Sequence, residues 1–290
     1  EELILNQKIE SIFNTKYPLH NIELLIGSDN STDGTNKILK EAERQYPQIR
    51  LKLFTQRQGK ISIINQLQQL AQGELLIVTD ANVLFNPDTL PELIAPFADD
   101  RVGLVDTHMT NYGLKSHGIS VQEKSYISRE VYIKHLESIN FGTMIGPFGG
   151  CYAIRNKLFT PVPTTYLVDD FFICMNVLAQ KKMAINNLNA RVSEDVSNDL
   201  GIEFKRKIRI GTGNFQNLKH FAHLLWPPFS PVSFCFVSHK VLRWLGPFFI
   251  LGAFVSNAVL ASHSTFYLVL FGSQLCVTIL PLLDFIARNI

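Results

Sequence analysis

Short apolar runs alternate with stretches of helical spacing through the first 200 residues. Four runs have the length and the apolar, β-branched composition of strands, at residues 22–26, 51–54, 75–79 and 102–106. The stretches between them repeat apolar residues at helical spacing, at 35–46, 60–72 and 88–98. Strands that alternate with helices indicate βαβ units and a mainly parallel sheet with flanking helices. The pattern therefore predicts an α/β fold.

The pattern changes near residue 227. Two stretches without a charged residue follow, at 244–261 and 265–283, and each approaches the roughly 20 residues that cross a bilayer. Basic residues flank the pair on its outer sides, which places both outer flanks in the cytoplasm. We expect two transmembrane helices, and a buried helical hairpin of a soluble protein is the alternative. Residues 216–243 are rich in aromatics and suit an interfacial segment.

Composition and charge exclude several classes of protein. The 290 residues are 46% hydrophobic and 18% charged, which is enough apolar material for a large core and excludes a disordered chain. A net charge of +2, with lysine and arginine scattered, argues against nucleic acid as a partner. The 4 cysteines are far apart, so neither a zinc site nor a disulfide framework is indicated, and a reducing compartment fits.

Two predicted strands end in acidic turns. Asp29 follows the first strand within "GSDNSTDGT" (27–35), and Asp80 follows the third within "TDAN" (79–82). In α/β sheets ligands bind beyond the carboxyl ends of the strands. A carboxylate at the end of a buried strand must be paired, hydrogen-bonded or bound to metal. On the residues alone a structural cap is favoured for Asp80, although its carboxylate and Asn82 could also ligate a hard divalent cation.

Three later segments carry candidate chemistry. "VDDF" (168–171) opens a helical stretch, where its acids could cap the helix and suit its dipole. "GTMIGPFGG" (142–150) clusters glycines, which is typical of a surface loop and also lets a ligand approach the backbone closely. "RKIRIGTGNFQ" (206–216) is a basic run that suits a solvated or lipid-facing surface.

These motifs, together with "RQGK" (57–60), occur in an order that resembles glycosyltransferase family 2. Its members are inverting enzymes of the GT-A fold, a Rossmann-like architecture, and use nucleotide-sugar donors. The resemblance covers residues 1–226, and the apolar tail is similar to that of the membrane polysaccharide-synthase branch. It implies a GT-A catalytic domain at 1–215 with its first strand missing before residue 1, an interfacial segment at 216–243 and two transmembrane helices within 244–290.

The resemblance also implies roles for individual residues. Asp170 is the catalytic base and Asp169 its neighbour, while Asp80 and Asn82 hold Mg²⁺ or Mn²⁺ against the donor diphosphate. Asn82 stands where the family's DxD motif has its second acid. The implied nucleotide-binding and donor-binding residues are Asp29, Arg57, Lys60, Asp80, Arg206 and Arg209, and the implied sugar-pocket residues are Gly149 and Gly150. Glu194 matches a further acid of the family.

The sequence thus predicts a membrane-associated glycosyltransferase of the hexosyltransferase type. It would move a sugar from a nucleotide-sugar donor, expected to be a UDP-sugar, to a glycan or lipid-linked acceptor in polysaccharide synthesis, with a metal ion. We expect a multi-pass inner-membrane protein with a cytoplasmic catalytic domain. Two alternatives remain open: a polyprenyl-phosphate sugar transferase, and a non-catalytic scaffold subunit of a polysaccharide export complex. The second is motivated by Asn82 and by Ile210, which replaces the family's tryptophan.

Overall fold

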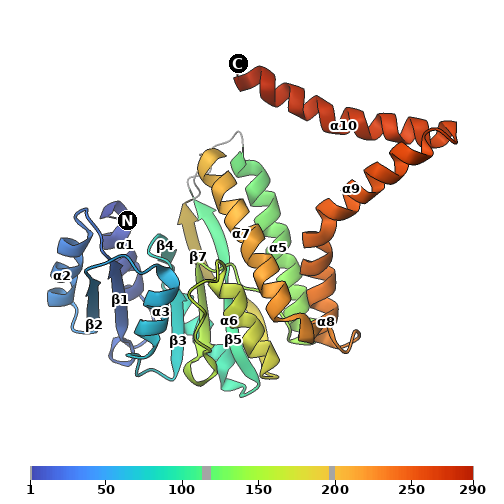
Figure 1. Ribbon diagram of the computed structural model, residues 1–290. Helices are drawn as coiled ribbons and strands as arrows, with labels where there is room; N and C mark the ends of the chain where they lie inside the picture. Colours follow the sequence, from blue (N-terminus) through green and yellow to red (C-terminus); the bar gives the residue numbers. More distant parts are fainter. Residues whose placement is uncertain (1, 113–118, 196–199, 290) are drawn as a thin grey trace. The chain divides into compact units, whose positions relative to one another are not determined.

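The computed structural model describes residues 2–112, 119–195 and 200–289 (Figure 1). The chain divides into two compact units, Glu1–Val237 and Ser238–Ile290. The first unit has the predicted α/β architecture, and the second is helical. The domain limits that the sequence predicts, at 215 and 243, fall inside helices α7 and α9, and they stay predictions about function.

Most elements of the first 100 residues lie close to where the sequence predicts them, while β4 (Val83–Phe85) is a short strand that the sequence does not predict. In chain order the elements are α1 (Glu2–Phe13), β1 (Leu24–Asp29), α2 (Thr35–Gln45), β2 (Ile49–Phe54), α3 (Lys60–Gln68), β3 (Leu75–Thr79), β4 (Val83–Phe85) and α4 (Thr89–Ile94). Short 3-10 helices lie at Leu19–Asn21 and Ala95–Ala98. The predicted strand at 75–79 coincides with β3, and the predicted first strand begins two residues later and runs on to Asp29.

The remaining elements of the first unit complete the sheet and cover it. They are β5 (Val102–Tyr112), α5 (Ile119–Phe141), β6 (Cys151–Arg155), α6 (Asp169–Ala179), β7 (Met183–Asp195), α7 (Leu200–His220) and α8 (Pro231–Cys235). Further 3-10 helices lie at Asn156–Leu158 and Ala222–Leu225. The glycine-rich segment enters β6, and "VDDF" opens α6, so both motifs meet the ends of regular elements.

The strands form a mixed arrangement where the sequence predicts a mainly parallel sheet. β1 and β2 pair in parallel as one sheet, and a second sheet has the order β3-β6-β5-β7-β4. Within it β5 and β7 are parallel, whereas β6 runs antiparallel to both β3 and β5, and β4 runs antiparallel to β7. The sheet is mixed because the chain reverses direction in the glycine-rich loop, so that β6 runs opposite to β3 and β5. Its register sets Thr79 opposite Cys151.

A groove separates the two sheets. Consecutive residues at the start of β1 and along β3, 22–25 and 73–79, line a cavity of about 850 Å³. Among the described residues β1 pairs only with β2, and β3 only with β6, so each strand has one open edge. Buried backbone groups need hydrogen-bond partners, and an extended segment in the groove would supply them. The first strand that the resemblance implies stays a prediction.

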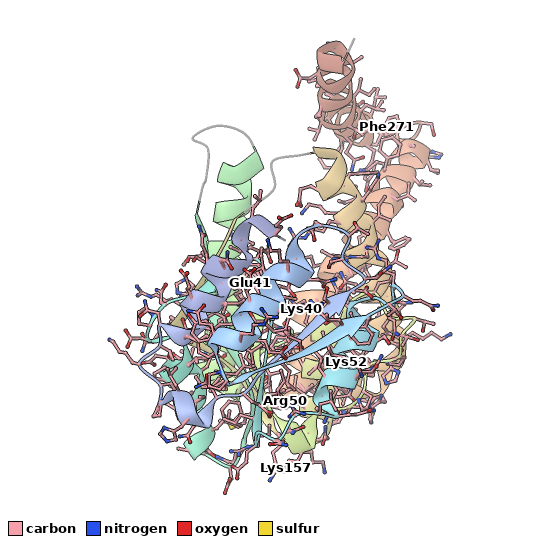
Figure 2. All side chains as sticks on the ribbon, turned by 90° about the vertical axis from the view of Figure 1, so that its left-hand side faces the viewer. Lys40, Glu41, Arg50, Lys52, Lys157 and Phe271 are labelled. Atoms are coloured by element: carbon pink, nitrogen blue, oxygen red, sulfur yellow. The ribbon has the colours of Figure 1, made fainter. Side chains whose placement is uncertain are left out.

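The core and the rim of this unit follow the apolar pattern. Leu5, Ile9 and Phe13 of α1 pack with Leu39 of α2, while a larger cluster centres on Val105, Cys151 and Val192. The outer edge is charged, since Figure 2 shows Lys40 and Glu41 of α2 beside Arg50 and Lys52 of β2. Charged side chains along an edge strand disfavour its pairing with another chain.

The second unit contains α9 (Leu242–Leu260) and α10 (Thr265–Asn289), preceded by a π-helical turn at Phe236–Val241. By length and composition one helical run of the described part, Pro231–Leu260, could cross a membrane, whereas the apolar part of α10, Thr265–Pro281, is shorter. The two helices pack together, with Asn257 Nδ2 donating to Gln274 Oε1 over 3.1 Å. The first predicted transmembrane helix therefore has a counterpart, and the second stays a prediction.

Candidate active site

The turn after β3 presents Asp80 at the edge of the sheet. Its backbone N–H donates to the carbonyl of Gly150 over 2.9 Å, and its own carbonyl accepts from Val83 over 3.3 Å. These bonds tie the turn to the glycine-rich loop on one side and to β4 on the other. The Asp80 side chain is 35% exposed, so its carboxylate is fixed at the root and open to a ligand.

Lys60, the first residue of α3, joins two motifs that lie far apart in the sequence. Its Nζ is 2.8 Å from Asp80 Oδ1 and 3.7 Å from Asp169 Oδ2. Burial lowers the pKa of Lys60, but the carboxylates of Asp169 and Asp80 outweigh this and hold the pKa above its usual value. Lys60 therefore keeps its positive charge between the two acids. A positively charged side chain is suited to bind phosphate.

The acids of "VDDF" form the first turn of α6. Val168 is the N-cap residue and its side chain does not cap the helix, whereas Asp170 Oδ1 accepts from the first-turn N–H of Phe171, as the sequence allows for this acidic pair. The buried Asp169 Oδ2 has no hydrogen-bond partner in the described part of the chain, since Lys60 lies too far for one. This oxygen is ion-paired with Lys60 but keeps a free hydrogen-bonding position, which a ligand or a water could fill.

Asp170 has the electrostatics of a general base. Withdrawal of its carboxylate from water and the charge of Asp169 raise its pKa to about 7, against the opposing effect of Lys60. Its Oδ1 accepts from the N–H of Phe171 over 2.6 Å, which leaves Oδ2 as the second oxygen. A base works best when its pKa lies near the working pH, because it is then ionised and still basic.

The two predicted sugar-pocket glycines lie between these acids. Gly149 has φ +86°, and a Cβ on it would overlap Asp170 Oδ2. A Cβ on Gly150 would come within 2.5 Å of Met109 Cε, and the Gly150 carbonyl accepts from Asp80. The loop can pass this close only because both residues lack a side chain. The loop therefore contacts Asp170 and the Asp80 turn together.

Asp29 anchors the "RQGK" segment. Its two carboxylate oxygens accept from the N–H groups of Gln58 and Gly59 over 2.6 and 2.9 Å. Two charge-assisted bonds to consecutive amides fix the loop that leads into Lys60. Arg57 is exposed and forms no hydrogen bond or ion pair with a described residue. The structure thus shows a loop-anchoring contact for Asp29 and leaves its nucleotide role a proposal.

Asn82 faces Glu194 across β4 and β7. Its Nδ2 donates to Glu194 Oε1 over 2.9 Å, which leaves the amide oxygen for a ligand. Burial raises the pKa of Glu194, while the Asn82 amide and the charge of Arg206 oppose the rise. Arg206 itself pairs with Glu203 over 3.3 Å. Arg206 therefore lies at the margin of this cluster, where its charge acts on Glu194.

Arg209 is placed by the packing of α7. Gly213 of that helix lies against Val168, since a Cβ there would come within 2.5 Å of Val168 Cγ2. Asn217 Nδ2 donates to the Val168 carbonyl over 3.2 Å. Residues four apart share a helix face, so Arg209 lies one turn along the face that contacts the residue before Asp169. Its side chain is exposed and forms no contact within the described residues that would fix it.

Sequence reasoning missed two buried lysines at this site. Lys8 of α1 is 4% exposed and donates to Thr79 Oγ1 over 2.8 Å and to the Val83 carbonyl, so it bridges the two ends of the Asp80 turn. Burial lowers the pKa of Lys8 to about 8. A signal was present, since Lys8 stands in the apolar stripe of Leu5, Ile9 and Ile12. The other is Lys134, which pairs with Asp106.

The residues present fit a divalent cation as partial ligands. Asp80 and the Asn82 amide oxygen are hard donors of the kind that Mg²⁺ and Mn²⁺ prefer, and Mg²⁺ commonly completes its shell with substrate phosphates and water. No group of three or more histidine, cysteine, aspartate or glutamate residues in the described part could hold a metal by itself. A cation at Asp80 and Asn82 would therefore need further ligands from outside the described residues.

Asp80 at the carboxyl end of β3, Lys60 at the start of α3 and the acidic pair at the start of α6 meet beside a mixed α/β sheet, an arrangement that fits a glycosyltransferase of the GT-A class. A family model for Glycosyl transferase family 2 matches residues 1–160. The chain belongs to glycosyltransferase family 2. Asp169 and Asp170 lie beyond the matched residues, so their catalytic roles stay a prediction.

Comparison with a solved structure agrees with this fold. The chain is similar to the mannosyltransferase PcManGT from Pyrobaculum calidifontis, solved in complex with GDP-Man and Mn²⁺. The TM-score is 0.71 at 21% identity, and the match covers 96% of this chain and 77% of that chain. At this identity the likeness shows the fold, with its sheet and flanking helices.

Curated relatives match part of the chain. It is 28% identical over 136 residues to a beta-monoglucosyldiacylglycerol synthase from Nostoc sp., which is 46% of this chain and 29% of that protein. It is 26% identical over 133 residues to a dolichyl N-acetyl-alpha-D-glucosaminyl phosphate 3-beta-D-2,3-diacetamido-2,3-dideoxy-beta-D-glucuronosyltransferase from Methanococcus voltae, which is 46% of this chain and 41% of that protein. The chain thus spans less than half the length of these two relatives.

Proposed function

We propose that this glycosyltransferase transfers a sugar from a nucleotide-sugar donor to a lipid-linked acceptor at a membrane, with inversion at the anomeric carbon. The observation that carries the proposal is the convergence of Asp80 and Asp169 on Lys60, with Asp170 beside the glycine-rich loop. Lys60 and Asp80 are suited to bind a diphosphate and its metal ion. The proposed base, Asp170, lies beside the glycine-rich loop that contacts the Asp80 turn. Asp29, Arg57, Arg206 and Arg209 are proposed to bind the nucleotide or its phosphates.

The proposed reaction is a single displacement. Asp170 takes the proton from an acceptor hydroxyl, and the hydroxyl oxygen forms a bond to the anomeric carbon from the face opposite the diphosphate. The bond from that carbon to the diphosphate oxygen breaks, and its electron pair leaves with the nucleotide. Lys60 stabilises the negative charge that develops there. Mg²⁺ or Mn²⁺ held by Asp80 and Asn82 would supply Lewis-acid stabilisation of the same group.

The acceptor class is inferred from the relatives. The names of both curated relatives describe a lipid or lipid-linked product or acceptor, a glucosyldiacylglycerol in one and a dolichyl-phosphate sugar in the other. Exposed apolar helices in the second unit would hold the site near such acceptors. A growing glycan of a polysaccharide remains the second candidate, and Ile210 in place of the family's tryptophan weighs against it.

Nucleotide binding tests the donor site. We expect UDP or GDP to bind the full chain in detergent more tightly with Mn²⁺ than without it, and Asp80→Ala to remove this gain, which we place at about tenfold or about 1.4 kcal/mol. The metal-free affinity should not fall, because the variant frees Lys60 for phosphate. Isothermal calorimetry measures both. Asp88→Ala, an exposed aspartate paired with Lys16, is the control. If neither nucleotide binds the native chain, the proposed transferase activity is contradicted and the non-catalytic scaffold subunit is favoured instead.

A membrane role for the interfacial segment predicts that Trp226 contacts lipid. Trp226 and Phe229 are 77% and 93% exposed, an unusual pair of aromatics for a water-facing loop. In a Trp244→Phe background, which leaves Trp226 as the single tryptophan, we expect its fluorescence to be quenched by brominated lipids in proteoliposomes. Tryptophan favours the headgroup level of a bilayer. Quenching by aqueous iodide alone would place the segment in water and contradict the membrane role.

A further inference from the structure

A fully buried ion pair lies beneath the active site. Lys134 Nζ of α5 is 3.1 Å from Asp106 Oδ2 of β5, and the two side chains are 1% and 0% exposed. Neither residue enters the proposed mechanism. Replacing such a pair by apolar residues is often neutral or stabilising, because desolvation of the two charges offsets their attraction. Stability alone therefore gives little reason for the pair to be here.

Both charges hold the same residue of the glycine-rich loop. Lys134 Nζ lies 3.8 Å from the ring centroid of Phe148, at cation–π distance. The backbone N–H of Phe148 lies near enough to the Asp106 carboxylate to stabilise its charge. Burial raises the pKa of Asp106, and the Lys134 ammonium and the N–H groups of Phe148 and Thr107 oppose this by stabilising the carboxylate. Phe148 is thus held through its ring by Lys134, and its backbone N–H interacts with the charge of Asp106.

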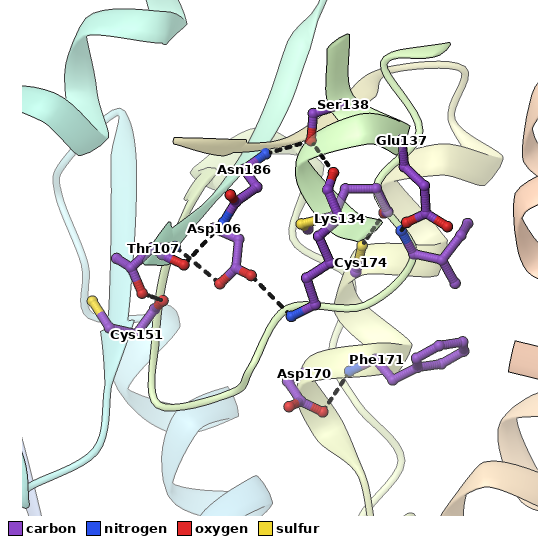
Figure 3. Close-up of polar contacts among 12 residues, drawn as sticks. Asp106, Thr107, Lys134, Glu137, Ser138, Cys151, Asp170, Phe171, Cys174 and Asn186 are labelled. Atoms are coloured by element: carbon purple, nitrogen blue, oxygen red, sulfur yellow. Dashed lines mark hydrogen bonds and ion pairs between the residues drawn. The ribbon is translucent and has the colours of Figure 1, made fainter. Parts of the chain in front are cut away.

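The pair is itself fixed by a hydrogen-bonded network that joins three elements (Figure 3). The Ser138 hydroxyl donates to the Lys134 carbonyl over 2.6 Å and accepts from the Asn186 N–H over 2.7 Å. Asn186 Nδ2 donates to the Thr107 carbonyl over 3.0 Å. The network links α5 to β5 and β7, so the two charges have little freedom to move.

Phe148 leads directly into the glycines that contact both acids. Gly149 lies against the Asp170 carboxylate, and the Gly150 carbonyl accepts from the Asp80 N–H. A shift of Phe148 would therefore move the support of the base and of the donor turn together. Productive transfer needs these two groups at a fixed separation, and a displacement of about 1 Å can cost ~10²-fold in rate.

We infer that Asp106 and Lys134 are positioning residues, which hold the Phe148–Gly150 segment and thereby set the placement of Asp170 relative to Asp80. The inference rests on the proposed function of those two acids. The pair acts through the loop and touches neither donor nor acceptor. Its removal should therefore change turnover and leave nucleotide affinity unchanged.

Two variants test this. Asp106→Asn/Lys134→Met removes both charges and keeps an acceptor oxygen for the Phe148 N–H, while Phe148→Leu keeps the pair and removes the ring. We measure nucleotide release from UDP-glucose and GDP-mannose by the full chain in detergent, with diacylglycerol or dolichyl phosphate as acceptor. Each variant should lower kcat by about 10- to 100-fold at unchanged UDP or GDP affinity. Combining them should lower kcat no further, because both act through Phe148.

Melting temperature separates positioning from folding. The paired variant should melt no lower than the native chain, whereas Lys134→Met alone, which leaves Asp106 buried without its cation, should melt lower. Ile154→Val, in the fully buried core of β6, should lower the melting temperature and leave kcat unchanged. A native kcat in the paired variant, or a loss of kcat matched by losses of affinity and stability, overturns the inference. Absence of nucleotide binding in the native chain would instead refute the proposed function.

Discussion

Asp170→Asn is expected to lower kcat for transfer to a hydroxyl acceptor by about 10²- to 10⁴-fold. An amide cannot take the proton of the acceptor, although its oxygen can still accept from the Phe171 N–H as Asp170 Oδ1 does. The shape of the site is kept, so nucleotide affinity should be unchanged. Steady-state nucleotide release measures the loss, and calorimetry measures the affinity.

The size of this loss also identifies the acceptor. A lipid phosphate is already ionised at neutral pH and needs no base, so Asp170→Asn would then have a small effect on kcat. That outcome, with nucleotide binding intact, would favour the polyprenyl-phosphate transferase. Asp100→Asn is the matched control, because its side chain is 99% exposed and lies outside the site. A large loss in the control would show that the assay reports folding.

The same variant should change the pH dependence of stability. The pKa of Asp170 rises from 3.8 to about 7 on folding, so the folded chain binds this proton more tightly than the unfolded chain does. The stability that results is present below the unfolded pKa and is lost as pH rises through about 7. Asp170→Asn lacks this loss. We expect it to melt higher than the native chain at about pH 8, and by less at about pH 5.

Thermal melts without nucleotide across this range test the sign. If the native chain and Asp170→Asn show the same dependence on pH, the raised pKa of Asp170 is contradicted. A gain of stability that accompanies a loss of activity would be typical of a group that the fold holds in an unfavourable state for catalysis.

The sequence predicts the positions of the acids better than their partners. Asp29 and Asp80 end apolar runs whose strand character is local, so their place at the sheet edge follows from the chain itself. Lys60 was expected to contact the nucleotide, but its position between Asp80 and Asp169 depends on how α3 and α6 meet across the sheet. Residue spacing carries no information about such a contact.

The buried pair shows the same limit more sharply. Asp106 stands within an apolar strand and Lys134 within a long helix, and each by itself suits a solvent-facing position. Their pairing arises because α5 packs on β5, a tertiary contact. The sequence pattern does not predict that β6 is antiparallel, for a related reason. The direction of β6 depends on how the glycine-rich loop turns, and the order of helices and strands along the chain does not specify that turn.

Gly149→Ala should damage both activity and stability. The backbone at Gly149 has φ +86°, a conformation that costs an L-residue about 1–2 kcal/mol. A Cβ there would also overlap Asp170 Oδ2, and such overpacking costs about 1–3 kcal/mol more. The overlap can be relieved only by moving the loop or the base. We therefore expect kcat to fall by ~10²-fold with nucleotide affinity retained, and the free energy of unfolding to fall by about 2–5 kcal/mol.

Two other glycines separate the causes. Gly59 has a similar φ of +82° but nothing within 4 Å of an added Cβ, so Gly59→Ala measures the backbone cost alone. Gly211 lies in α7 with open space around it, so Gly211→Ala should raise stability by about 0.5–1 kcal/mol. A larger loss in Gly149→Ala than in Gly59→Ala, from urea denaturation, would show that the contact with Asp170 adds to the backbone cost. Equal losses in the free energy of unfolding would mean that Gly149 is needed only for its backbone conformation. The position of Asp170 would then not depend on Gly149.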